Sequence, residues 1–391
     1  MNIIMLEMKK VFRPLNILLV ALITLISFNI FIIPEIEQLE TGEPSKQDRD
    51  VGIILATKYG GIIDSKEMED LKQIRDDKER ESTEYLLRQP ESEKANIKNY
   101  RDFYYGREQE FTQRREYVDI ELLKEIEYRV LFEEDIYLFW ELPIIEEYID
   151  RYENVESVID IDYYKPLGEK VVNRLEEIQA SEKFITPMND TVHSNYDEIM
   201  FWENVIVIIS LIIIISPIFI NDKKTKVNYI QYSSKTGRNI FKKKVITGLI
   251  STFIIVTIQL IIFFTAYKRL GTYAYWDTYI NSIMSFNYFW FDLTFGQYII
   301  MTVILLYIVS VLICLISMYI SSKTISHLSL IGIQVPIAFG VIMFQLKFGT
   351  TYVTNIYMPK YTTLIIYSII IIASIGLCLY MINKEKVLDI K

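Results

Sequence analysis

Six long runs of apolar residues restrict this 391-residue chain to a membrane fold. A helix of about 20 apolar residues crosses the hydrocarbon core of a bilayer, and a helix pairs its backbone polar groups internally, as that core requires. The chain is therefore predicted to be an all-α polytopic membrane protein with six transmembrane helices. The predicted spans are residues 15–33 and then, within a five-helix domain over residues 199–382, residues 199–220, 245–267, 298–320, 328–346 and 362–382.

The segment before the first run has the pattern of an amphipathic helix. Apolar side chains recur on one helical face from Ile4 to Val11, and charged residues occupy the rest. Residues 1–14 are predicted to lie in the membrane interface as a helix. The run at 15–33 is interpreted as an uncleaved anchor, because Pro34 follows it where a signal peptide would have a small-residue cleavage site.

Residues 34–198 contain no apolar run long enough to span, and they carry about twice as many acidic as basic residues. We expect them to form one extracytoplasmic domain that is mostly helical. Asp64, followed three residues later by Glu67, predicts a capped helix start. Two short stretches, residues 51–59 and 155–164, are predicted as minor strands, the second from its alternating pattern.

A strongly basic segment, residues 221–244, lies between the second and third runs. It contains eight Lys or Arg residues against the single acid Asp222. Short loops rich in Lys and Arg remain on the cytoplasmic side of a membrane. With the termini and this segment inside, the cytoplasmic segments hold 15 basic residues and the two short outer loops hold four. Both termini are therefore predicted to be cytoplasmic, including a short tail at residues 383–391.

Motifs for several kinds of chemistry are missing from the sequence. No glycine is directly followed by a lysine, which excludes a phosphate-binding P-loop of the G-x-x-x-x-G-K-[ST] type. The chain has two histidines, at positions that cannot form H-E-x-x-H, and no G-x-S-x-G nucleophile motif. We expect no catalytic, cofactor or metal site in this chain, and therefore no enzyme acting by itself.

Polar residues inside the predicted spans are few and mostly uncharged. Glu203, about one helical turn inside the second span, is interpreted as an interfacial residue, with a functional carboxylate as the alternative. Asn29, Gln259 and Gln334 are candidates for a substrate path, with hydrogen bonding between packed helices as the alternative. The deeper parts of the spans hold no ionisable residue, which argues against a proton-coupled carrier.

The order of features in the basic segment resembles a known family. Asp222 follows a helix end, a YIQYSS stretch comes next, Gly237-Arg238 follows, and three lysines precede the next span. Together with the amphipathic entry helix, the single span, the large outer domain and the five later spans, this resembles the transmembrane subunit of a type-2 ATP-binding-cassette (ABC) exporter. The chain departs from that pattern where lysines follow the acid, because that family often has glycine nearby.

The resemblance implies that residues 221–244 form a coupling loop, which docks into a separate ABC ATPase subunit that binds ATP and Mg²⁺. Apolar anchors flanked by bases suit such a docking site. It also implies a bacterial cell membrane, contact with lipid, and a second permease copy as a homodimer or paired permease; nucleic acid is not expected as a partner. The residues expected to couple to the ATPase are Asp222, Tyr229, Ile230, Tyr232, Gly237 and Arg238.

The cargo and the class of function remain open at this point. An apolar membrane body without deep charges favours export of a hydrophobic or amphipathic substrate, such as a peptide, an antibiotic or a lipid-like molecule; the family also leaves sodium export open. The alternative is a membrane-anchored sensor or mechanotransmission protein, whose outer domain binds a ligand without transport. A membrane-embedded enzyme or scaffold is a third reading. The alternative for the basic segment itself is that it docks no partner, and only fixes the orientation of the chain in the membrane and contacts anionic lipid.

Overall fold

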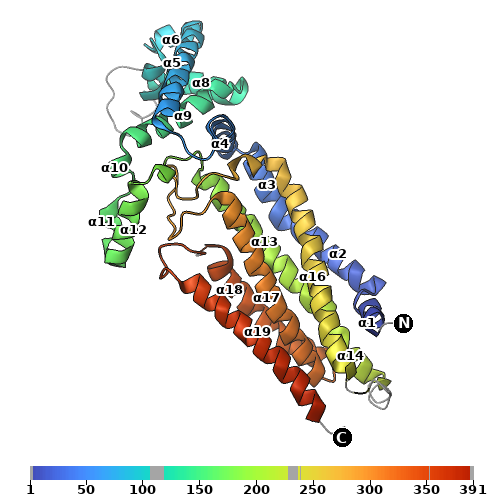
Figure 1. Cartoon of the computed structure of the whole chain (residues 1–391). Helices are drawn as coiled ribbons and strands as arrows, with labels where there is room; N and C mark the ends of the chain where they lie inside the picture. Colours follow the sequence, from blue (N-terminus) through green and yellow to red (C-terminus); the bar gives the residue numbers. More distant parts are fainter. Residues whose placement is uncertain (1–2, 106–118, 228–236, 238, 352, 388–391) are drawn as a thin grey trace. The chain divides into compact units, whose positions relative to one another are not determined.

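The computed structural model describes residues 3–105, 119–227, 237, 239–351 and 353–387 (Figure 1). The chain divides into two compact units. We call the first, residues 1–40, 192–273 and 288–391, the membrane unit, because it holds almost all of the long apolar helices. We call the second, residues 41–191 and 274–287, the polar unit.

Among the described residues, six helical segments are long and apolar enough to cross a membrane, in agreement with the predicted number of spans. The described residues contain no strand, and only isolated bridges of β type occur among them. The predicted helical fold with six candidate membrane-spanning helices is therefore confirmed for the part of the chain that the structure describes. The candidate spans are Pro14–Thr41, Asp190–Lys224, Asn239–Leu270, Phe295–Lys323, His327–Thr350 and Thr362–Glu385.

The N-terminal part of the membrane unit consists of a short helix and a long one. Helix α1 (Ile3–Val11) packs against α14 and α16. Pro14 starts α2 (Pro14–Ser27), because a proline at the first helical position loses no hydrogen bond. The helix continues through a π-helical stretch, η1 (Phe28–Ile32), into α3 (Ile33–Thr41). Most of the side chains on α2 are exposed and apolar, as expected for a helix that faces lipid.

The second candidate span is broken near one end. Helix α13 (Asp190–Ile215) stops at Ser216, and α14 (Pro217–Lys224) follows. Because Pro217 interrupts the helical ladder, nearby backbone groups need other partners. Ser321 supplies them: its hydroxyl donates to the Ser216 carbonyl at 2.5 Å and accepts from the backbone N–H groups of Phe219 and Ile220 at 3.3 and 3.2 Å.

Four further long helices lie in the described part of the membrane unit. Helix α17 packs against α14, α16, α18 and α19. At Gly248 on α16, a Cβ atom would lie 2.5 Å from Met318 Sδ on α17, so the Met318 side chain would have to shift. The bounds are α16 (Asn239–Tyr267), α17 (Phe295–Lys323), α18 (His327–Gln345) and α19 (Thr362–Val387).

The polar unit is a set of packed helices with its own core. Aromatic and aliphatic side chains such as Tyr100, Ile126 and Phe139 are buried together there. Asp64 and Glu67 form the predicted capping box at the start of α5. Its longer helices are α4 (Ser45–Tyr59), α5 (Ser65–Leu87), α8 (Ile120–Tyr128), α9 (Tyr137–Glu153) and α12 (Glu169–Gln179), and its short ones are α6 (Pro90–Lys94), α10 (Val155–Val158) and α11 (Ile161–Tyr164).

The prediction of minor strands is wrong. Residues 51–59 form the second half of α4, and residues 155–164 form the short helices α10 and α11. In α4 the residues Val51, Leu55 and Ala56 lie on one buried helical face, so burial follows the helical period and outweighs the local preference for strand.

A segment that is distant in sequence completes the polar unit. Residues 274–287, between α16 and α17 in the chain, belong to it. Tyr275 is fully buried and donates its hydroxyl to the Arg49 carbonyl at 2.8 Å. Ser282 donates to the Met188 carbonyl at 2.5 Å. These hydrogen bonds hold the segment on the polar unit although Ser282 and Met188 are 94 residues apart in the chain.

Candidate functional site

Four charged side chains of the membrane unit form what we call the ion cluster. Lys10 on α1 donates to Glu7 at 2.8 Å and to both carboxylate oxygens of Asp222 at 3.1 Å. Lys244 on α16 donates to the same Asp222 carboxylate from the other side. Asp222 lies on α14 and is only 6% exposed. One carboxylate therefore links three helices, α1, α14 and α16, which Figure 1 shows next to one another.

The charges of the ion cluster balance, which allows it to be buried. Two acids face two bases, and a buried charge is tolerated when it is paired and hydrogen-bonded. Burial acts to lower the pKa of Lys10, but the hydrogen bonds and negative charges of Glu7 and Asp222 outweigh it, so the pKa lies above its usual value. The Lys244 ammonium also lies 5.1 Å from the centre of the Phe219 ring, a favourable cation–π distance.

The ion cluster borders the basic segment on both sides. Asp222 is the second residue of the segment and Lys244 is its last, so the two ends meet at the Asp222 carboxylate, which Lys10 connects to α1. Gly237 has a positive φ of 48°, a conformation in which glycine is favoured. The other predicted coupling residues, Tyr229, Ile230, Tyr232 and Arg238, lie outside the described residues.

A second feature of the membrane unit is a groove of about 470 Å³ between α2 and α16, which we call the membrane groove. Figure 1 shows these two helices, blue and yellow, next to each other. Asn29 and Gln259, both predicted for a substrate path, line it together. The remaining lining is apolar except for Thr24, and consists of Phe12, Ile17, Val20, Ala21, Leu25, Phe28, Ile33, Ile214, Ile255, Ile258 and Ile262.

The polar side chains of the membrane groove are partly satisfied by neighbouring helices. Gln259 donates from Nε2 to the hydroxyl of Ser210 at 2.7 Å and to that of Thr24 at 3.2 Å. Its Oε1 atom is buried and has no hydrogen-bond partner among the described residues. Asn29, within the π-helical stretch of the first span, donates to the Leu25 carbonyl at 2.8 Å. Gln259 thus joins three helices and keeps one unused acceptor.

Gln334 lies apart from the other two predicted path residues. It is on α18 and accepts a hydrogen bond from Ser216 at 2.8 Å, at the break between α13 and α14. It is not part of the groove lining. The structure therefore brings Asn29 and Gln259 together and places Gln334 at a helix junction, where it contributes to pairing the polar groups around Pro217.

Glu203 does not reach the surface of the described structure, which corrects its interpretation as an interfacial side chain. It is 1% exposed on α13, within a candidate span. Neither carboxylate oxygen has a hydrogen-bond partner among the described residues. Tyr196, Glu203 and Ser210 are spaced by seven and share one face of α13, with Tyr196 against Tyr267 and Ser210 against Gln259 of α16. Glu203 therefore lies between these two contacts. In the sequence, Glu203 lies near the end of the apolar run, where a side chain can reach the membrane interface. Its burial was therefore not predicted.

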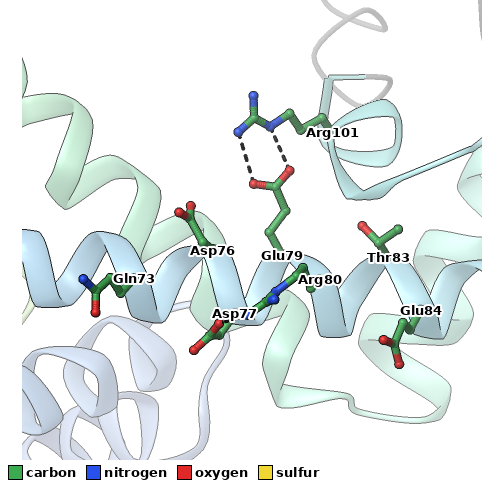
Figure 2. Close-up of a pocket in the computed structure, with 8 residues that line it drawn as sticks. All are labelled: Gln73, Asp76, Asp77, Glu79, Arg80, Thr83, Glu84 and Arg101. Carbon is green, nitrogen blue, oxygen red and sulfur yellow. Dashed lines mark hydrogen bonds and ion pairs between the residues drawn. The ribbon is translucent and has the colours of Figure 1, made fainter.

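The polar unit has a wide hollow of about 860 Å³ along α5 (Figure 2). Figure 2 shows Glu79 and Arg101 facing each other across it, and their two hydrogen bonds are 2.8 and 3.2 Å long. The other lining side chains are polar or charged and include Asp76, Asp77 and Arg80. Exposed ion pairs of this kind are typical of a solvated helix face, so we assign no site to it.

Comparison with known proteins does not assign the chain to a family. No family model matches the sequence, and no curated protein or solved structure matches it. The resemblance to an ABC exporter subunit remains a prediction, and the function has to be argued from the ion cluster and the membrane groove.

Proposed function

We propose that this chain is the transmembrane permease subunit of an ABC exporter, driven by ATP that a separate subunit hydrolyses. The observation that supports the proposal is the ion cluster, which joins the two ends of the basic segment at Asp222 and connects them to α1 through Lys10. A force applied to that segment by a docked ATPase would act directly on α14 and α16, and through Lys10 on the interfacial helix α1.

The physical chemistry of the ion cluster suits this task. Removing one partner of a buried ion pair costs about 3–5 kcal/mol, because the remaining charge is left unpaired. Helices joined by such a pair therefore move together more easily than they separate. In this proposal, Asp222 makes α1, α14 and α16 respond as one body to the ATPase.

The remaining parts of the proposal follow from the sequence. The basic segment and both termini lie in the cytoplasm, and the polar unit lies outside a bacterial cell membrane. A second permease copy forms the other wall of the pathway, and the cargo is hydrophobic or amphipathic. ATP and Mg²⁺ are bound by the partner ATPase.

The test of this function uses Asp222→Asn, which keeps the shape of the side chain and removes its charge. The complex with the ATPase is reconstituted into vesicles, and ATP hydrolysis and cargo flux are measured together. We expect the complex to assemble and flux per ATP hydrolysed to fall at least tenfold, because Lys10 and Lys244 lose their shared anion. Unchanged flux per ATP in Asp222→Asn would refute the coupling role.

A matched control is available in the same unit. Glu40 pairs with Arg269 at 2.6 Å, away from the basic segment in sequence. Glu40→Gln removes an ion pair without touching the ion cluster, so flux per ATP is expected to stay at the level of the unmodified chain. A comparable loss in both variants would indicate general damage to the membrane unit.

A membrane sensor is the second candidate function, and the separate core of the polar unit favours it. Such a unit can fold around its own contacts and bind a ligand while the spans transmit the signal. ATP-dependent flux in sealed vesicles separates the two functions, because a sensor changes conformation on binding its ligand and moves no cargo.

A further inference from the structure

Two tyrosine–lysine pairs meet at one end of the membrane unit. The sequence repeats Tyr-x-x-x-Lys at residues 319–323 on α17 and at residues 380–384 on α19. These helices pack along each other, as Figure 1 shows in orange and red. The ring centres of Tyr319 and Tyr380 lie 6.2 Å apart. Because this contact is near the C-terminal end of both helices, the two pairs lie at the same end.

The lysines follow their tyrosines by one helical turn, at the ends of two candidate spans. Lys323 is the last residue of Phe295–Lys323, and Lys384 is the last but one of Thr362–Glu385. Lys384 donates from Nζ to the Tyr380 hydroxyl at 2.7 Å, and Lys323 is exposed. The ends of membrane-spanning helices lie at the level of the lipid headgroups. Two ammonium groups and two phenol hydroxyls are therefore placed at that level.

The positive charge at this end is not balanced by ion pairs. Neither Lys323 nor Lys384 forms an ion pair among the residues that the structure describes. Glu385 and Lys323 both lie close enough to Lys223 on α14 to interact with its charge. A third lysine thus adds to the positive charge, and Glu385 offsets one of the three. Such an excess at headgroup level attracts an anionic group of the membrane.

The surface next to the tyrosine pair, toward the middle of the span, is apolar and open. Ile372, Gly376 and Tyr380 are spaced by four and share one side of α19. Ile372 is 69% exposed, and a Cβ atom at Gly376 would have no atom within 4 Å. A hydrocarbon chain can therefore lie on this side of α19 below the Tyr380 ring. A free anion would use the donors alone, whereas a phospholipid contacts both the donors and this surface.

We propose that Tyr319, Lys323, Tyr380 and Lys384, which we call the headgroup site, bind the phosphate of an anionic phospholipid. The ammonium groups supply the opposite charge, and the phenol hydroxyls donate hydrogen bonds to phosphate oxygens. One acyl chain lies along α19 over Gly376. A choline lipid binds more weakly, because the lysines repel its ammonium group.

This binding requires neither ATP nor the ATPase. In the orientation of the proposed function, the headgroup site faces the cytoplasmic leaflet. Lipid binding by the purified chain tests the site by itself, and failure of cargo flux in vesicles would count against the exporter function alone.

Dioleoyl phosphatidylglycerol and dioleoyl phosphatidylcholine are the probes for the full-length chain in neutral detergent, with bound lipid counted by native mass spectrometry. The two lipids share their acyl chains and phosphate and differ in net charge. With two lysines at the headgroup, we expect phosphatidylglycerol to bind about thirtyfold more tightly, equivalent to about 2 kcal/mol. Equal affinity of the unmodified chain for both lipids would overturn the proposal.

Two double variants locate the site. Lys323→Gln with Lys384→Gln removes both ammonium groups and should reduce the preference to less than about threefold. Lys347→Gln with Lys360→Gln is the matched control, because these lysines also lie beside aromatic rings, at 5.5 and 5.6 Å from the ring centres. The control should keep the preference. An equal loss in both double variants would show that the preference follows net charge alone and would overturn the site.

A second arm separates a lipid from a free anion. Tyr380→Phe removes one hydroxyl and should weaken phosphatidylglycerol binding several-fold, whereas Tyr361→Phe, at an exposed tyrosine beside the control lysine Lys360, should not. Inorganic phosphate at millimolar concentration carries the same oxygens without acyl chains and should leave the lipid bound. Displacement of the lipid by inorganic phosphate would show a site for the free anion and contradict the proposal.

Discussion

At the scale of single residues, Glu203 is a carboxyl group in an unfavourable environment. Both of its oxygens are buried in a candidate span and lack partners among the described residues. An unsatisfied buried polar group costs about 1–3 kcal/mol. Glu203→Met keeps the length of the side chain and removes both oxygens, so we expect the melting temperature of the purified chain to rise by a few degrees.

The control is Glu198→Met on the same helix. Glu198 is exposed and accepts a hydrogen bond from Trp202 at 2.9 Å, so its loss should leave the melting temperature unchanged or slightly lower. A lower melting temperature in Glu203→Met would show that its carboxyl group is paired within the protein and stabilises the fold.

Asp48 of the polar unit gives a pH-dependent prediction. Burial raises the pKa of its carboxyl above the usual value, opposed by a hydrogen bond from Thr191 at 3.0 Å and assisted by the charge of Glu147. The folded state therefore binds the proton more tightly than the unfolded state. The free energy of unfolding falls as pH rises above about 4 and through the raised pKa, and it remains lower at neutral pH.

Asp48→Asn cannot ionise and still accepts the Thr191 hydrogen bond. We expect backbone amides of α4 to exchange several-fold more slowly at pH 7 in this variant, with a weaker dependence on pH. Asp70→Asn is the control of opposite sign, because hydrogen bonds from Lys58 and Tyr59 lower the pKa of Asp70. Faster exchange in Asp48→Asn at pH 7 would contradict the prediction.

The sequence predicted some single-residue features and missed others for a definite reason. Asn29 and Gln259 were selected as polar residues within spans, and they line one groove. The partner of Asp222 on α1 was not foreseen, because Lys10 is 212 residues away and no pattern in one sequence reports such a contact. Local spacing predicts which residues share one face of a helix. It does not predict which other helix that face contacts, because this depends on how the helices pack.

At the scale of helices, Gly248 lies where α16 packs closely against α17. Its missing side chain leaves room for Met318 and Cys314. Overfilling a well-packed contact costs about 1–3 kcal/mol, so Gly248→Leu is expected to lower the melting temperature by several degrees. Gly340→Leu is the control, because a Cβ at Gly340 has no atom within 4 Å. Equal melting temperatures of the two variants would show that α16 and α17 do not pack this closely.

The helices themselves were largely predictable, and the errors have a common cause. Long apolar runs and the capping box at Asp64 have strong local signals, and the structure has helices there. The stretches 51–59 and 155–164 are short, and short apolar patterns fit both helix and strand. In α4, tertiary burial of one helical face decides the outcome.

At the scale of the whole molecule, the sequence predicted a polar region between the first and second spans but not its full extent. Residues 274–287 join the polar unit from a distant part of the chain, held by buried contacts such as that of Tyr275 with Arg49. This segment is rich in aromatic residues, which the sequence explains equally well as a membrane-interface loop. The buried hydrogen bonds of Tyr275 and Ser282 to the polar unit distinguish the two.

The most direct measurement for the exporter function is purification of the full-length chain from its native membranes in mild detergent, with identification of co-purifying subunits and an assay of ATP hydrolysis. We expect a P-loop ATPase to co-purify and hydrolyse ATP. Tyr229→Asp, which puts a charge on a predicted apolar anchor of the basic segment, should lose that subunit, while Tyr273→Asp, an exposed tyrosine beyond α16, should retain it. A purified chain without any ATP-hydrolysing subunit, or a subunit retained equally by both variants, would contradict the proposed coupling.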